Sequence, residues 1–181
     1  MAKTVLVLVP HPDDAEISAG GTIARMAREG ARVIIVVASS GNKGSFAHDA
    51  PTLARVRAEE ARRAAAVLGA EPPVLLEHPD FELDRLPPGA LREQFIRAIR
   101  QQRPDLLIAQ DPWTPYEGHP DHRAVAWAAS DAVNFASLPL VHPEHLAEGL
   151  EPHYVAEKYF YGTGAADVDR VVDIGETIEL K

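Results

Sequence analysis

Cysteine is absent from this 181-residue chain. Its absence excludes disulfide frameworks, thiolate metal sites and cysteine nucleophiles. Cationic residues are also few, because 18 lysines and arginines face 27 aspartates and glutamates, which gives a formal charge of −9. That balance argues against a nucleic-acid binder, which needs cations to replace counterions, and against docking on an anionic membrane surface.

A long apolar run is missing as well. The longest runs, near residues 4–9 and 33–38, are far shorter than the roughly 20 residues that cross a membrane. The first run does not read as a signal peptide, because the polar stretch 10–14 interrupts it. We therefore expect no membrane partner and a cytoplasmic location.

Residues that build a globular core are present in ordinary proportions. Hydrophobic residues make up 46% of the chain and charged residues 25%. The length suffices for one hydrophobic core and is short for two. We expect a single domain over residues 1–181.

Short buried strands alternate with amphipathic helices along the chain. Leucine and β-branched runs indicate strands buried on both faces, and apolar residues at helical spacing indicate helices. The predicted strands are residues 4–9, 32–38, 74–77, 105–109, 155–161 and 170–174. The predicted helices are residues 17–29, 52–68, 87–102 and 120–136. Gly20 and Gly21 inside the first helix predict a close approach of that helix to the sheet.

This alternation predicts an α/β fold, in which a mostly parallel sheet is covered by helices on both faces in three layers. Ligands of such sheets bind beyond the carboxyl ends of the strands, where the strand order changes direction. We therefore look for chemistry in the loops that follow residues 9, 38 and 109.

Two of these loops carry histidines and aspartates at short spacing. His11 and Asp14 are three residues apart after the first strand, and His119 and His122 are three apart at the start of a helix. His11, Asp14 and His122 together make a set of two histidines and one carboxylate. Three protein ligands with an open position are typical of a catalytic zinc site, and the same set also suits Fe²⁺.

Three further groups remain beside the predicted metal site. Asp13 has the chemistry of a general base for an attacking water. His119 has the chemistry to stabilise an oxyanion or to protonate a leaving amine. Asp121 can either hydrogen-bond His119 and raise its pKa or orient a metal ligand through a hydrogen bond.

Both motifs resemble those of the LmbE-like (PIG-L) family of metal-dependent N-deacetylases. The resemblance extends over nearly the whole chain and in the same order. Its elements are Pro10-His11-Pro12-Asp13-Asp14-Ala15-Glu16, Gly41-Asn42-Lys43-Gly44-Ser45, Arg57-Ala58-Glu59-Glu60-Ala61 with Leu68-Gly69, His119-Pro120-Asp121-His122, and Val172-Asp173-Ile174.

The resemblance implies a Rossmann-like fold and a zinc-dependent amidohydrolase that removes acetate from an N-acetylglucosamine-containing small molecule. The implied zinc ligands are His11, Asp14 and His122. It makes Asp13 the general base and His119, supported by Asp121, the oxyanion stabiliser or acid. Arg57 would bind the sugar or its attached group. The partner is then a small amino-sugar substrate, and such folds often form homo-oligomers.

Other interpretations stay open from the sequence. A metal-dependent hydrolase of another amide or of an ester would carry the same residues, and a non-catalytic α/β module could hold a structural cation. Some family members have a tyrosine two residues before the first histidine of the second motif, where this chain has Glu117. Asp80 is expected in an ordinary loop, and His142 and His145, which repeat the histidine pattern, are expected at the surface.

Overall fold

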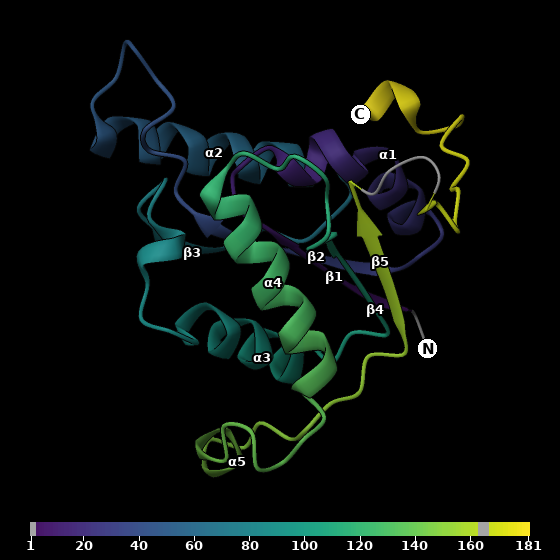
Figure 1. Ribbon diagram of the computed structural model, residues 1–181. Coiled ribbons are helices and arrows are strands. Elements are labelled where there is room, and N and C mark those ends of the chain that lie inside the picture. The colour runs from purple at the N-terminus through teal and green to yellow at the C-terminus, as the bar shows by residue number, and fades with distance from the viewer. Residues whose placement is uncertain (1–2, 163–166) are drawn as a thin grey trace.

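Five parallel strands form one sheet in this computed structural model, which describes residues 3–162 and 167–181. The strands are β1 (Thr4–Val9), β2 (Arg32–Ser39), β3 (Val74–His78), β4 (Leu106–Gln110) and β5 (Glu157–Tyr161). Their spatial order is β3-β2-β1-β4-β5, and every pairing among them is parallel (Figure 1). The predicted parallel sheet is confirmed.

Helices cover both faces of this sheet, which makes the predicted three layers (Figure 1). On one face lie α1 (Asp14–Arg28) and α2 (Ala50–Leu68). On the other lie α3 (Ala90–Gln102) and α4 (Pro120–Phe135). Shorter elements within the described ranges include α5 (Glu144–Ala147) and the 3-10 helices Leu83–Arg85 and Ile178–Leu180.

The central strand β1 shows why its sequence is apolar without interruption. Alternate side chains of a strand point to opposite faces of the sheet. Val5, Val7 and Val9 therefore join the core under α1 and α2, whereas Leu6 and Leu8 join the core under α3 and α4. Both cores are closed to solvent, so neither set of positions tolerates polar residues.

The chain changes direction within the sheet between β1 and β4. From β1 the chain proceeds outward through β2 to β3, and from β4 it proceeds outward on the other side to β5. The loops that follow β1 and β4 therefore lie where the strand order changes direction, at the carboxyl ends of the two strands, which is where ligands of such sheets bind. This is the predicted location for a ligand.

The prediction of a strand at residues 170–174 is wrong. This segment is irregular and packs along α1, where Arg25 Nη1 donates to the carbonyl of Asp173 at 2.8 Å. A Cβ added at Gly21 would lie 2.6 Å from Cδ1 of Ile174, so this glycine admits the C-terminal segment. Gly20 and Gly21 therefore bring α1 close to the C-terminal segment, whereas the sequence predicted a close approach to the sheet.

The prediction that His145 lies at the surface is also wrong, because its side chain is fully buried. Its Nε2 lies 2.7 Å from Glu93 Oε1, and its Nδ1 lies 3.1 Å from Nη1 of Arg100. Since an arginine only donates, Nδ1 of His145 accepts and Nε2 carries the proton. Both ring nitrogens of His145 are therefore engaged in hydrogen bonds within the protein. Its proximity to His142 and Glu144 resembles a metal site, but neither nitrogen is left to bind a metal.

Arg100 itself is buried and anchors the segment between α4 and α5. Its guanidinium donates to the backbone carbonyls of Ala136, Leu138, Val141 and His142. A buried arginine is tolerated here because its donors meet acceptors on every side.

No helix in the described part of the chain has the length and apolarity that a membrane crossing requires.

We expect Arg100→Met to lower the free energy of unfolding by about 3 kcal/mol, because several buried carbonyls lose their donor at once. Arg92→Met is the matched control on the same helix. Arg92 forms a half-exposed ion pair with Asp131, so its loss should cost about 1 kcal/mol or less. Equilibrium urea unfolding of both variants measures the difference, and equal losses would contradict the anchoring role.

Candidate metal centre and active site

Three of the predicted site residues converge at the carboxyl end of β1. His11 follows β1, Asp14 opens α1, and His122 lies in the first turn of α4. His11 Nδ1 lies 3.2 Å from Asp14 Oδ2 and 3.2 Å from His122 Nε2. One donor atom from each residue falls within a group whose members all lie within 4.8 Å of one another.

The opposite nitrogen of His11 faces two carboxylates. Its Nε2 lies 3.1 Å from Asp80 Oδ1 and 3.3 Å from Asp121 Oδ2. A carboxylate only accepts, so the proton of a neutral His11 belongs on Nε2. That tautomer leaves the lone pair of Nδ1 directed towards Asp14 and His122, as a metal ligand requires.

His122 is oriented in the same manner by Glu117. Its Nδ1 lies 3.2 Å from Glu117 Oε2, which leaves Nε2 free to face His11 and Asp14. Glu117 is itself held by Gln110 Nε2 at 2.7 Å and by the backbone N–H of His119 at 2.8 Å. Glu117, at the position where some family members have a tyrosine, therefore accepts a hydrogen bond from His122 and orients its ring.

Sequence reasoning missed Asp80 and Glu117 as members of the site. Asp80 was expected in an ordinary loop, yet its side chain is nearly buried against His11. Glu117 could have been predicted from its position, because it lies five residues before His122 in the loop that leads to the second histidine motif.

The charge of the cluster favours a bound cation. Four carboxylates, those of Asp14, Asp80, Glu117 and Asp121, surround two imidazoles. Burial alone would lower the pKa of His11, but hydrogen bonds to Asp121 and Asp14 and the charge of Asp80 raise it to about 10. In the absence of a metal, a proton on His11 supplies the positive charge, so a metal must displace that proton. The donor set and its charge fit a divalent ion with nitrogen and oxygen ligands.

Asp13 lies at the N-terminus of α1 and is paired with Arg57 of α2. Arg57 Nη2 donates to Asp13 Oδ2 at 2.7 Å and to the carbonyl of Pro12 at 2.6 Å. Gly41, with φ of +62°, passes so close that an added Cβ would lie 3.0 Å from Cδ of Pro12. The predicted sugar contact, Arg57, is thus engaged with the predicted base.

His119 caps the N-terminus of α4 and lies against the other two histidines. The backbone N–H of Asp121 donates to His119 Nδ1 at 3.2 Å, so a neutral His119 carries its proton on Nε2. Its ring meets that of His11 edge-on with centroids 4.6 Å apart. Burial and the charges of His11 and His122 lower the pKa of His119.

The carboxylate of Asp121 serves His11 and the loop after β3. It accepts the backbone N–H groups of Phe81 at 2.7 Å and Leu83 at 2.9 Å, besides facing His11. Burial raises the pKa of Asp121, but these hydrogen bonds outweigh it and hold the pKa below its usual value. Of the two roles predicted for Asp121, orientation of a candidate metal ligand is the one that matches its hydrogen bonds.

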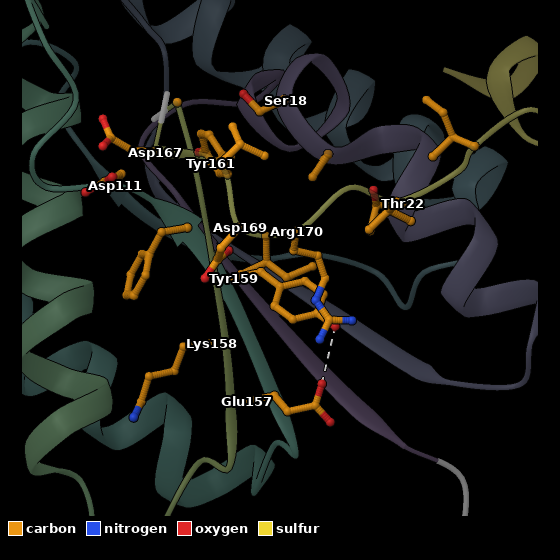
Figure 2. Close-up of a pocket in the computed structure, with 17 residues that line it drawn as sticks. Ser18, Thr22, Asp111, Glu157, Lys158, Tyr159, Tyr161, Asp167, Asp169 and Arg170 are labelled. Carbon is orange, nitrogen blue, oxygen red and sulfur yellow. Dashed lines mark hydrogen bonds between the residues drawn. The ribbon is translucent and has the colours of Figure 1, made fainter. Parts of the chain in front are cut away.

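A separate cavity of about 670 Å³ lies between α1, β5 and residues 167–174 (Figure 2). Figure 2 shows Ser18 and Tyr161 at one end and Glu157 at the other. The Tyr161 hydroxyl is buried next to Ser18 and forms no hydrogen bond of ordinary geometry within the described residues. Burial and the charge of Asp14 raise its pKa. Among the described residues, none of the three candidate metal ligands lines this cavity.

Known proteins resemble this chain over most of its length. The chain is 36% identical over 181 residues to a diacetylchitobiose deacetylase of Thermococcus kodakarensis, covering 99% of this chain and 66% of that protein. It is 33% identical to a 1D-myo-inositol 2-acetamido-2-deoxy-alpha-D-glucopyranoside deacetylase of Rhodococcus erythropolis, covering 93% of this chain and 64% of that protein. The chain thus spans just under two thirds of the length of these curated relatives.

The fold agrees with a solved structure at the same level of similarity. The N,N'-diacetylchitobiose deacetylase of Pyrococcus horikoshii superposes with a TM-score of 0.91 at 35% identity, covering 99% of this chain and 67% of that chain. A family profile described as PIG-L, GlcNAc-PI de-N-acetylase, matches residues 6–133. The chain therefore belongs to the PIG-L family of de-N-acetylases, the LmbE-like family that its two histidine–aspartate motifs resemble.

Proposed function

We propose that this protein is a metal-dependent N-deacetylase that hydrolyses the acetamide of an N-acetylglucosamine-containing small molecule to a free amine and acetate. The observation that carries the proposal is the convergence of His11 Nδ1, Asp14 and His122 Nε2, which all lie within 4.8 Å of one another. The named activities of the two curated relatives agree with it. A single domain over residues 1–181 is part of the proposal.

In this proposal His11, Asp14 and His122 hold the metal, which we take to be Zn²⁺, with Fe²⁺ as the alternative. A metal held by three protein ligands polarises a carbonyl and lowers the pKa of a water at its open position. The carboxylates behind the two histidines, Asp80 and Asp121 for His11 and Glu117 for His122, fix their tautomers and orientation.

Asp13 is the proposed general base, which removes a proton from the attacking water. Its pairing with Arg57 occupies one carboxylate oxygen and leaves the other as a proton acceptor. Arg57 then acts as a positioning residue for Asp13, and the contact with the sugar expected of it becomes secondary. Because Asp13 is half-exposed, it can exchange its proton with solvent between turnovers.

His119 is the proposed donor to the oxygen or nitrogen of the scissile amide. Its Nδ1 already accepts from the backbone of Asp121, so Nε2–H is the group left to donate. The lowered pKa keeps the ring neutral near pH 7, which suits a hydrogen-bond donor to a developing oxyanion. The proton that Asp13 takes from the water is then available for the leaving amine, whereas His119 would protonate the amine only from its charged, doubly protonated form.

The substrate class follows from the relatives, whose names describe deacetylation of a chitobiose and of an inositol-linked sugar. Both compounds carry an acetylated amino sugar on a polar small molecule. We propose the same class here. The cytoplasmic location and the formation of homo-oligomers stay predictions.

Metal content and acetate release test the proposal together. We expect about one equivalent of zinc or iron in the purified protein and release of acetate from N-acetylglucosamine or its small conjugates, stopped by a chelator. His122→Ala should lose both. His142→Ala, which removes a partly exposed histidine that pairs with Glu144 and stacks on His145 away from the His11 cluster, is the control and should keep both.

Metal without acetate release from any such compound would overturn the substrate class. No metal after loading with zinc and with iron would overturn the metal site itself.

Asp13→Asn should lower kcat by about a hundredfold or more at unchanged metal content, the scale expected when a general base is lost. Glu60→Gln is the control, because Glu60 is the other carboxylate that Arg57 contacts, at 3.4 Å. Steady-state acetate assays on both variants measure the effect. A near-normal rate for Asp13→Asn would assign the base to another group.

Glu117→Gln should weaken metal binding about tenfold or more, because it removes the negative charge that orients and polarises His122. Glu144→Gln alters the equivalent pair at the surface, with His142, and should leave the affinity unchanged. Competition with a chelating dye measures both dissociation constants. Equal affinity in the two variants would remove Glu117 from the site.

A further inference from the structure

Phe81 presents an exposed aromatic ring next to His119 of the His11 cluster. The residue is 57% exposed. Its ring meets His119 edge-on, with centroids 5.4 Å apart. Any group that lies beside His119 on the open side of the cluster therefore lies close to this ring.

The backbone at Phe81 is held in an unfavourable conformation. Its φ is +61°, a region that costs energy for any residue with a Cβ. Asp121 holds it there by accepting the N–H groups of Phe81 and Leu83. The preceding residue is held as well, because Asp80 N–H donates to Asn42 Oδ1 at 3.0 Å.

The same two carboxylates fix this loop and the proposed metal ligand. Asp80 and Asp121 both face Nε2 of His11, so Phe81 lies next in sequence to one contact of His11 and is hydrogen-bonded to the other. Strained backbone persists where the surrounding contacts determine it, and such positions cluster where a ligand is bound. An exposed aromatic ring on a strained backbone does not stabilise the folded state. We therefore look for a ligand that this ring would contact.

The chemistry of the proposed substrate supplies a matching surface. Its reacting carbonyl would lie at the metal cluster, and the amide nitrogen joins that carbonyl to the sugar ring. A pyranose has a face of C–H groups, and an aromatic ring buries such apolar surface while hydroxyl groups at the edge remain hydrated.

We propose that Phe81 is a specificity-determining residue whose ring is the platform for the pyranose ring of the N-acetylglucosaminyl group. This inference rests on the proposed function and adds the contact by which the sugar is recognised. It predicts preference for an acetamide attached to a pyranose over one attached to an open chain.

Another exposed aromatic residue offers a matched control. Phe46 lies fully exposed in the loop between β2 and α2, and its ring makes no contact with a cluster residue within the described chain. Phe46→Ala removes the same amount of aromatic surface from a neighbouring loop.

The experiment measures binding of glucosamine, which has the pyranose but no acetyl group, and of acetate, which has no pyranose. Both are titrated calorimetrically into metal-loaded protein, and acetate release from N-acetylglucosamine compounds is followed in parallel. For Phe81→Ala we expect glucosamine affinity to fall about tenfold, with acetate affinity unchanged. KM should rise to a similar degree, with kcat within about twofold. Phe81→Tyr should restore binding, and Phe46→Ala should match the wild type.

Phe81→Gly separates loss of the ring from loss of the fold. It removes the ring but relieves the positive φ, so its melting temperature should equal or exceed that of the wild type while glucosamine binding stays weak. Unchanged glucosamine affinity in Phe81→Ala or Phe81→Gly would overturn the platform. Loss of acetate affinity instead would assign the ring to the acetyl methyl group and would also overturn it.

The two proposals fail in different ways. Acetate release by the wild type with Phe81-independent glucosamine binding would overturn the platform alone. Glucosamine binding that depends on Phe81, without acetate release from any N-acetylglucosamine compound, would overturn the reaction alone. No glucosamine binding by the metal-loaded wild type would overturn the platform directly.

Discussion

The imidazole of His11 is the group on which the rest of the site depends, because both of its nitrogens are engaged by different parts of the chain. Nδ1 faces Asp14 and His122, whereas Nε2 faces Asp80 and Asp121. The loop after β1, the loop after β3 and the first turn of α4 therefore meet at one ring. Through Asp121 the network continues to the backbone of residues 81–83, so one carboxylate contacts both the proposed metal ligand and the loop of the proposed sugar platform.

Most of the fold was predictable because its signals are local. Apolar runs and helical spacing located five strands and four long helices, since β1, β2 and β4 are buried on both faces and the helices on one. The failure at residues 170–174 has a physical reason. Ile174 is apolar because it packs on Gly21 of α1, and periodicity cannot distinguish that contact from one made within a sheet.

The site was predictable to the extent that its residues sit at helix starts. A short turn brings His11 and Asp14 together, as their spacing indicated, and His122 joins them because β1 lies beside β4 in the sheet. Asp80, Glu117 and Phe81 come from loops, where no periodicity places a side chain. His145 was misassigned for a similar reason, because the partner that buries it, Arg100, lies 45 residues earlier in the chain.

The strand order also sets a sequence of events during synthesis. β1 pairs with β4, and Thr4 and Asp105, which border that pairing, are 101 residues apart. Until β4 leaves the ribosome, the backbone N–H and C=O groups of β1 on that edge have no strand to pair with, which exposes the chain to aggregation. His122 is synthesised later still, because it lies 111 residues after His11 in the chain. The nascent chain therefore cannot present the proposed three-ligand set until most of the sheet has been made, and capture of the proposed metal would be one of the last steps of its maturation.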